Sequence, residues 1–533
     1  MNKQTIPYSQ TTFFSSLIND YLTDDEKLHP FINHNCSLQA FADAIAERKQ
    51  TTINRELLTK QLHHQYKGLP LSDAVKKNIE QLKNNNCFTV TTGHQLNLFT
   101  GPLYFLYKII SVINLAKTLK ATYPENDFIP VFWMATEDHD FEEINHFNLF
   151  NERLSIQKEA GEDGAVGRLS LTNAPHVAQQ LEELLGDRNG GDKIVELFRQ
   201  FYTSNNNFTQ ATKALVNHLF GEYGLVIIDG DDAELKKSMI PYFEQELVAQ
   251  KNHQFIEKTT QQLTDLGYKS QVTPREINLF YLDNNLRERI VVEDEQYKVL
   301  NTNLSFTKEE ILTELNNHPE KFSPNVVMRP LYQEVILPNL AYIGGGGELA
   351  YWFQLKDMFN VNNVFFPTLI LRNSVLVIDA GSTKKMQKLS LEVPQLFEDT
   401  EELIKEYVTQ HADINLALSQ QKEQLAKLYE TIENKAVQLD KTLQAVVNAE
   451  LQKAINGINN IEARLLKAEK QREEVAVNQI RSIKDKLFPN GGLQERHDNM
   501  SSLLLFYGMD IIPTLMQHLH PLDKELVVLV DER

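Results

Sequence analysis

The sequence predicts an α/β protein with a parallel sheet, followed by a long α-helical coiled coil. The first observation is the order strand, glycine turn, helix and strand between residues 86 and 150. Such a βαβ unit requires parallel strands and a right-handed crossover. The second is a stretch without proline between Pro394 and Pro489, in which apolar residues recur every three or four positions. That spacing is typical of a coiled coil.

Composition limits the kind of protein that this chain can be. Its 533 residues are enough for two or three domains, and 42% hydrophobic with 23% charged residues is ordinary for a folded protein. The net charge of −19 opposes general binding to nucleic acid or anionic membranes. We find no uncharged apolar run long enough to cross a membrane, no secretory signal, and only two cysteines, Cys36 and Cys87. We therefore expect a cytoplasmic protein that binds neither nucleic acid nor membrane.

The predicted core spans residues 86–385 and follows a mainly helical segment, residues 1–85. "NCFTV", which ends at Val90, has the β-branched and aromatic residues of a buried strand. "LYFLYKIISVINLAKTL" repeats its apolar residues at helical spacing, and "FIPVFWMA" is a second strand. The glycines of the intervening turn therefore lie where a strand gives way to a helix.

Residues 223–239 repeat this order, with a buried strand, the acidic turn "DGDD" and then a helix, and residues 363–379 supply further strand material. We interpret residues 151–222 and 240–325, approximately, as inserted connecting segments. Ligands of open parallel sheets bind at the carboxyl ends of the strands. The glycine turn and the acidic turn are therefore expected to face one crevice.

The predicted coiled coil spans residues 395–487, with its apolar stripe running from Leu425 to Ala468. Asp440 could cap a second helix and create an antiparallel hairpin, and Gly457 is another possible interruption. The alternative is a helix packed on its own domain. "LFPNGG" ends the helix, and residues 488–533 form a closing segment.

The first candidate site is the glycine turn "TGHQLNLFTGPLYFLYK". Gly93 and Gly101 permit close backbone approach to a ligand, and Thr100 could cap the following helix. His94 and Gln95 offer hydrogen-bond donors. Unpaired N–H groups at such a helix start attract anions such as phosphate. The alternative is a turn that requires glycine only for its backbone conformation. Neither of the two common phosphate-binding sequence motifs, the Walker pattern and GxGxxG, is present.

The second candidate site, "ATEDHDFEEINH", directly follows the second strand. A carboxylate beside an imidazole can orient it and raise its pKa. Asp138, His139 and Asp140 therefore suit general-base catalysis or contact with an ammonium group. A metal held by His139 and His146 is a weaker alternative because their spacing is not typical of ligands. The remaining alternative is that this segment is a solvent-exposed turn without a functional role.

The third candidate site combines a run of four glycines, Gly344 to Gly347, with the helix expected to start near Glu348. Such a run allows close approach of the backbone to a ligand or very tight packing. Arg329 and Arg372 are guanidinium forks suited to carboxylate or phosphate.

Four segments together resemble the BshC family of bacillithiol biosynthesis, the cysteine-adding enzymes. They are "TGHQLNLFTGPLYFLYKIISVINLAKTL", "PVFWMATEDHDFEEINH", "SPNVVMRPLYQEVILPNLAYIGGGGELAYW" and "LFPNGGLQER", in the family's order over nearly the whole chain. The family pattern usually has Gln at the position of His94. The resemblance implies a Rossmann-like core similar to class I nucleotidyltransferases and a coiled coil that pairs two chains into a homodimer.

The resemblance also implies a ligase that joins the carboxyl group of L-cysteine to the amine of glucosaminyl malate. Because this condensation is uphill at neutral pH, we expect ATP with Mg²⁺ to activate the carboxylate, through an adenylate or an acyl phosphate; no tightly bound metal is expected. The alternative functions are a nucleotide-binding coiled-coil scaffold without catalysis and a metal-dependent amidase that uses His139 and His146.

The expected catalytic residues are Asp138, His139 and Asp140. The expected substrate- or nucleotide-binding residues are Gly93, His94, Gln95, Thr100, Gly101, Tyr104, Lys108, Arg329, Gly344, Gly345, Gly346, Gly347, Glu348, Arg372 and Arg496.

Overall fold

The computed structural model describes residues 1–186 and 188–533, which form two compact units. Unit 1 comprises residues 3–376 and 493–529, together with Met1. Unit 2 comprises residues 377–492 and 530–533, together with Asn2. The chain passes between the units within strands β1 (Asn2–Pro7), β14 (Val375–Ile378) and β15 (Glu525–Val530).

The centre of unit 1 is a five-stranded sheet of order β13-β12-β2-β3-β6 in which every pair is parallel. The strands are β2 (Cys87–His94), β3 (Asp127–Met134), β6 (Val226–Asp229), β12 (Asn339–Gly344) and β13 (Thr368–Leu371). The first strand of the sheet lies in the middle and the chain adds strands on both sides of it. This order is that of a Rossmann-like fold, and its topological switch point lies between β2 and β12.

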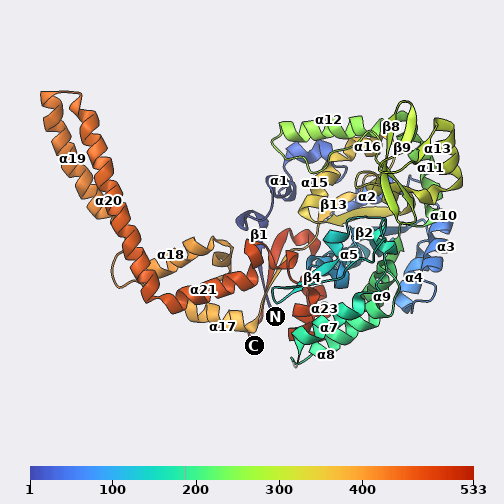
Figure 1. Ribbon diagram of the computed structural model, residues 1–533, viewed down its shortest axis with the longest axis horizontal. Helices are drawn as coiled ribbons and strands as arrows, with labels where there is room; N and C mark the ends of the chain where they lie inside the picture. Colours follow the sequence, from blue (N-terminus) through green and yellow to red (C-terminus); the bar gives the residue numbers. More distant parts are fainter. Residues whose placement is uncertain (187) are drawn as a thin grey trace. The chain divides into compact units, whose positions relative to one another are not determined.

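Helices cover this sheet because their apolar residues must be buried against it. Helix α5 (Tyr104–Thr122) joins β2 to β3 and contacts both, and most of its residues are buried. Helices α15 (Gly346–Gln354) and α16 (Lys356–Val361) join β12 to β13 (Figure 1). The N-terminal helices are α1 (Ser16–Leu22), α2 (Phe41–Arg48), α3 (Arg55–Gln65) and α4 (Asp73–Gln81), of which α2 contacts β12 whereas α3 and α4 contact β6.

The first inserted segment is mostly helical. It contains the two-stranded sheet of β4 (His146–Leu149) and β5 (Glu152–Ser155), then α7 (Ala174–Leu185), α8 (Gly191–Phe198) and α9 (Phe208–Phe220). Residue 187 of this segment lies outside the described residues.

The second inserted segment builds a sheet of its own. Its order is β10-β9-β8-β7-β11, and all pairs are antiparallel. The strands are β7 (Leu279–Asp283), β8 (Leu286–Glu293), β9 (Gln296–Val299), β10 (Ser305–Phe306) and β11 (Phe322–Pro324). Around them lie α10 (Ala233–Lys236), α11 (Ile240–Ala249), α12 (Asn252–Asp265), α13 (Lys308–Asn317) and α14 (Met328–Ile336). Helices α22 (Met500–Tyr507) and α23 (Ile511–His518) complete unit 1.

Unit 2 is helical over residues 380–487 and contains a long antiparallel hairpin. Its helices are α17 (Ala380–Leu389), α18 (Thr400–His411), α19 (Ser419–Leu439), α20 (Leu443–Arg472) and α21 (Glu474–Leu487). Helices α19 and α20 lie side by side along their length (Figure 1). The carboxylate of Asp440 accepts the N–H of Thr442 in the turn between them. Helix α20 runs without a break through Gly457, so the expected interruption there is wrong.

The hairpin buries little of its own apolar stripe. No residue of α19 or α20 is buried within the described chain. Leu428, Ile432, Val446 and Ile461 are among the exposed large apolar side chains. The alternative of a helix packed on its own domain is therefore wrong for this segment. No helix within the described ranges is both long and apolar enough to cross a membrane.

The turn between β2 and α5 provides a test of the fold. Gly101 has φ +58° and ψ −135°, a conformation that side chains disfavour. A Cβ atom there would lie 2.6 Å from the Cβ of Asn97. We expect Gly101→Ala to lower the free energy of unfolding of unit 1 by about 2–4 kcal/mol, from backbone strain and overpacking.

The measurement is urea unfolding followed by tryptophan fluorescence, because both tryptophans of the chain, Trp133 and Trp352, belong to unit 1. The control is Gly457→Ala, which meets open space within α20 and should leave this transition unchanged. A Gly101→Ala protein as stable as the unaltered chain would contradict the assignment of strain to this turn.

Candidate functional site

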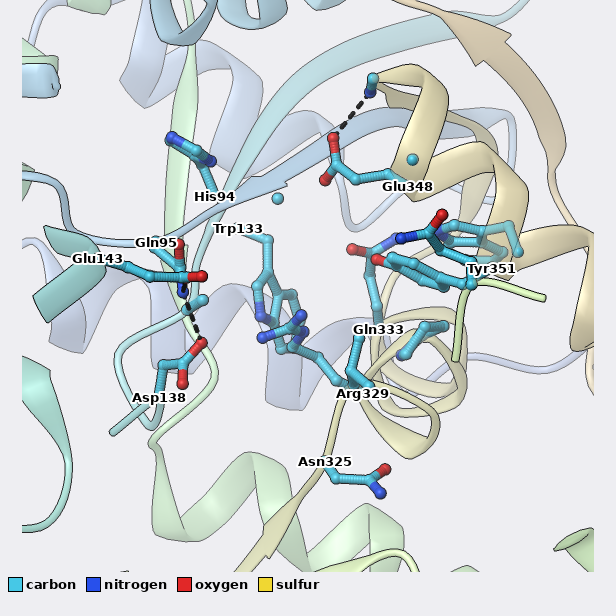
Figure 2. Close-up of a pocket in the computed structure, with 18 of the residues that line it drawn as sticks. His94, Gln95, Trp133, Asp138, Glu143, Asn325, Arg329, Gln333, Glu348 and Tyr351 are labelled. Carbon is cyan, nitrogen blue, oxygen red and sulfur yellow. Dashed lines mark hydrogen bonds between the residues drawn. The ribbon is translucent and has the colours of Figure 1, made fainter. Parts of the chain in front are cut away.

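A cavity of about 790 Å³ opens at the carboxyl ends of the central strands, at the topological switch point of the sheet. Its walls come from the end of β2, the loop after β3, the glycine run after β12, helix α14 and the second inserted segment. Figure 2 shows Gln95, Glu143 and Asp138 on one side of the cavity, Glu348 and Tyr351 on the other, and Arg329 between them.

An ion pair formed by a buried lysine and a partly exposed glutamate joins the ends of β2 and β12. Lys108 lies on α5 with only 2% of its side chain exposed, and its Nζ is 2.7 Å from Glu348 on α15. The same Nζ donates to the carbonyl of Gly93 at 2.7 Å. Burial lowers the pKa of Lys108, and the Glu348 carboxylate opposes that shift. The pair therefore fixes two of the cavity walls relative to each other.

The glycine run is explained by close packing around Glu348. The N–H of Gly345 donates to the Glu348 carboxylate at 2.7 Å, and Tyr342 donates its hydroxyl at 3.0 Å. A Cβ atom on Gly344 would lie 3.0 Å from the Cβ of Glu348. Gly345, Gly346 and Gly347 line the cavity, whereas Gly344 does not. Gly344 therefore fits the alternative of tight packing, whereas Gly345 to Gly347 fit the alternative of close backbone approach to a ligand.

His94 at the end of β2 lines the cavity as a neutral imidazole. Burial, followed by the charges of Lys108, Arg372 and Arg329, lowers its pKa well below the usual range. Its ring packs against Tyr104 and Phe105 with centroid distances of 5.4 and 5.2 Å. Its Nε2 is buried without a hydrogen-bond partner in the described structure. A buried polar atom without a partner is unusual, and beside a cavity it indicates a partner that the single chain does not supply.

Asp138 is an ionised carboxylate held in place by its neighbours. Its oxygens accept the side-chain amide of Gln95 at 3.0 Å and the backbone N–H of His139 at 2.7 Å. Burial alone would raise the pKa of Asp138, but hydrogen bonding to His139 and the charges of Arg329 and Arg287 outweigh it and hold the pKa well below its usual range. Such a carboxylate suits contact with an ammonium group.

The two arginines predicted to bind anions differ in whether a carboxylate of the chain already pairs with them. The guanidinium of Arg372 is buried, pairs with Glu495 at 2.7 Å, and stacks 5.1 Å from the ring centre of Tyr104. Only its Nε remains without a hydrogen-bond partner. Arg329 lines the same cavity from α14 and forms no ion pair within 4.0 Å among the described residues. Arg329 is therefore the better candidate for an anionic ligand.

Some residues that the sequence predicted to bind a ligand lie outside the main cavity. Thr100 is buried with 1% exposure, and α5 starts at Tyr104 without a side-chain cap, so the expected capping role of Thr100 is wrong. Neither Thr100 nor Gly101 lines the cavity. The carbonyl of Asp498 already accepts the N–H of Leu103 at 2.8 Å. This start of a helix is therefore less available to phosphate than the sequence indicated.

The acidic turn after β6 does not contribute to the cavity either. None of the residues from Asp229 to Asp232 is part of the lining, so the expectation of one shared crevice is wrong for this turn. Asp231 instead pairs with Arg168 and with the buried Lys236, which also holds Glu137 at 2.6 Å. These charges belong to a structural network behind the loop after β3.

Asp140 lies at the N-terminus of the short helix α6 (Phe141–Ile144), where its carboxylate accepts the N–H of Glu143 at 3.3 Å. It lines a second, neighbouring cavity of about 690 Å³ and not the main one. Arg496 lines both cavities. The loop after β3 thus places Asp138 and His139, but not Asp140, in the main cavity.

Sequence reasoning missed the wall supplied by the second inserted segment. Arg275, Arg287 and Arg289 all line the cavity, although this segment was interpreted as connecting structure. Arg287 and Arg289 lie on β8 two residues apart, and residues so spaced point to the same face of a strand. The alternation of Arg with other residues in "LRERIVV" was the one sequence pattern that could have indicated a cationic strand face here. Like Arg329, the side chains of Arg275, Arg289 and Arg496 line this cavity and form no ion pair among the described residues.

His139 lines the cavity beside Arg287, whose Nη1 lies 2.8 Å from the imidazole Nδ1. His146 likewise has Arg153 Nη2 at 3.0 Å from its Nδ1. Within residues 1–186 and 188–533, no group of three or more His, Cys, Asp or Glu side chains is arranged to hold a metal ion. This arrangement does not favour the amidase alternative.

The fold and the cavity define a class: a Rossmann-like α/β protein with a cationic site at its switch point and an appended helical hairpin. Residues 1–373 match the family model described as "Bacillithiol biosynthesis BshC, N-terminal Rossmann-like domain". Residues 375–530 match "Bacillithiol biosynthesis BshC, C-terminal coiled-coil domain". The chain belongs to the BshC family, which confirms the resemblance and the predicted fold class.

Curated relatives are similar to the chain over almost its whole length. A Flavobacterium johnsoniae protein is 45% identical, over 99% of this chain and 100% of its own. A Flavobacterium psychrophilum protein is 46% identical over 98% of each chain, and a Christiangramia forsetii protein 44% over 99% of each. All three relatives have the name "Putative cysteine ligase BshC".

The pKa of His94 leads to a pH-dependent prediction. Because the folded-state pKa is lowered, the unfolded chain binds more protons below about pH 6.5, and the free energy of unfolding falls as the pH decreases. His94→Gln removes this titration and retains a polar side chain. We therefore expect His94→Gln to become more stable relative to the unaltered chain as the pH is lowered from about 7 to 5.

The measurement is urea unfolding at several pH values, followed by tryptophan fluorescence. Asp229, whose pKa burial raises to about 6, is present in both proteins and cancels from the difference. A stability difference that does not change with pH would contradict a buried neutral His94.

Proposed function

We propose that this protein is a ligase of bacillithiol biosynthesis that joins the carboxyl group of L-cysteine to the amine of glucosaminyl malate. Family membership and the names of the relatives support a cysteine ligase. The observation that supports these substrates best is the combination, in one cavity, of the ionised Asp138 and several unpaired guanidinium groups. The acceptor has the matching charges, one ammonium group and two malate carboxylates.

In this proposal Asp138 binds the amino group of the sugar. Its carboxylate is oriented by Gln95, which also donates to Glu143 at 2.7 Å. Arg329, with Arg275 and Arg289 from the inserted segment, binds the malate carboxylates. The attacking nitrogen is thereby held in a fixed orientation, which is a large source of rate enhancement in bimolecular reactions.

The proposal includes ATP with Mg²⁺ as the reagent that activates the cysteine carboxylate. The residues present fit a polyphosphate, because His94 Nε2 and Arg372 Nε are buried polar atoms without partners at a cavity that also contains Gly345 to Gly347. These groups, with Arg496, would hold the phosphates. ATP would supply a good leaving group on the acyl carbon.

We also propose that two chains associate through the helical hairpin. Large apolar side chains on α19 and α20, including Leu428 and Val446, remain exposed in the single chain. A second hairpin would remove this apolar area from water.

The experiment is to incubate the purified protein with L-cysteine, glucosaminyl malate and Mg-ATP and to detect the coupled thiol by mass spectrometry. We expect product only when ATP is present, with AMP or ADP identifying the activation route. Asp138→Asn should lower kcat/KM at least about 100-fold, because it removes the charge that holds the amine.

The matched control is Asp140→Asn, two residues further along and outside the main cavity, which should retain most of the activity. Nucleotide binding without product, unaffected by Asp138→Asn, would support the scaffold alternative instead. Equal losses in the two variants would contradict the role assigned to Asp138.

A further inference from the structure

The contact between Arg287 and His139 determines where the imidazole has its proton. Arg287 Nη1 lies 2.8 Å from His139 Nδ1. A guanidinium group has only donors and no acceptor. His139 Nδ1 must therefore be the acceptor, and it has no hydrogen. In a neutral imidazole the proton then lies on Nε2, which makes that atom a donor.

Arg287 is held firmly enough to impose this state. The residue is 8% exposed, its Nε donates to Ser323 Oγ at 3.1 Å, and its Nη2 donates to the carbonyl of Pro324 at 3.4 Å. The guanidinium also stacks 3.9 Å from the ring centre of Phe280. The same ring lies 5.5 Å from the imidazole of His139, whose side chain is 51% exposed, so the buried Arg287 is the fixed member of the contact.

The other charged groups near His139 do not reverse this assignment. Asp138 Oδ1 lies 3.6 Å from Nδ1, too far for a hydrogen bond, and from His139 it accepts only the backbone N–H, at 2.7 Å. Asp163 is the other carboxylate whose pKa responds to the charge of His139, and it pairs with Lys158 at 2.8 Å. A proton on Nδ1 would place two donors against each other at the closest contact, that with Arg287.

We propose that His139 presents a neutral Nε2–H donor to the cavity and that Arg287 is the residue that positions it. The group it would recognise is a ligand oxygen with negative charge, such as a carboxylate or an acyl oxygen that gains charge during the reaction. Only the identity of that ligand rests on the proposed function. This assignment excludes His139 as the general base, one of the roles that the sequence left open.

The direct test is the tautomer of His139 in the full-length protein. Selective ¹⁵N-histidine labelling and long-range ¹H–¹⁵N correlation spectra at pH 7.5 distinguish the two neutral tautomers and the charged form. His139→Gln identifies the signals. We expect the Nε2–H tautomer alone. In Arg287→Met the signals should shift toward a mixture, whereas Arg289→Gln, on the same strand, should leave them unchanged.

The second test separates a donor from a base by kinetics. The amide nitrogen of a glutamine can replace Nε2–H as a donor, but glutamine cannot accept a proton at neutral pH. We expect His139→Gln to keep kcat/KM within about tenfold of the unaltered enzyme and His139→Ala to lose about 10²–10³-fold, as for removal of one donor to a developing charge.

The outcomes distinguish the two proposals. An Nδ1–H or charged His139 at pH 7.5 would overturn the inference whatever the activity. Equal losses in His139→Gln and His139→Ala, with the acidic limb of the pH profile abolished, would also overturn it. Absence of product with the unaltered protein would count against the proposed function alone, because the spectra of that protein still decide the tautomer. If Arg287→Met fails to fold, the same spectra suffice.

Discussion

The ion pair between the buried Lys108 and the partly exposed Glu348 is the interaction on which the site depends. In the interior an unpaired ammonium group is strongly disfavoured, so Lys108 requires the carboxylate and the Gly93 carbonyl that surround it. Glu348 in turn accepts the N–H of Gly345 and the hydroxyl of Tyr342. One cluster of charge and hydrogen bonds thus joins α5, the end of β2, the end of β12 and the start of α15. These elements enclose the switch point of the sheet, where the cavity opens.

Around this centre the cavity is lined by both carboxylates and guanidinium groups. Asp138 and Glu143 lie on one side with Gln95 between them, and the guanidinium groups of α14 and of the inserted sheet lie along other walls. The inserted segment therefore has a functional position, because it closes the cavity and supplies Arg287, which contacts the loop after β3. A small substrate with one ammonium group and several carboxylates would find groups of both complementary charges within this cavity.

Much of this arrangement could be predicted from local patterns. The parallel core, the hairpin at Asp440 and the placement of Gly93, His94, Gln95 and Lys108 all follow from strand and helix periodicity combined with turn residues. Thr100 and the acidic turn were misjudged because tertiary contacts decide their environment: residues near 498 occupy the start of α5, and Arg168 with Lys236 neutralises Asp231. Arg287 was missed because its partner lies 148 positions away in the chain, and no local pattern reports such a contact.

The measurement that tests this account most directly is a double-mutant cycle on Lys108 and Glu348, with urea unfolding followed by the fluorescence of Trp133 and Trp352. Glu348→Gln should lower the free energy of unfolding by about 3–5 kcal/mol, because it leaves the buried Lys108 ammonium group without its carboxylate. Lys108→Met should lower it less, because the Glu348 side chain is 27% exposed and keeps its bonds to Gly345 and Tyr342. The double variant should be at least about 1 kcal/mol more stable than the sum of the two losses implies. Two small and additive losses would contradict the claim that this ion pair holds the site together.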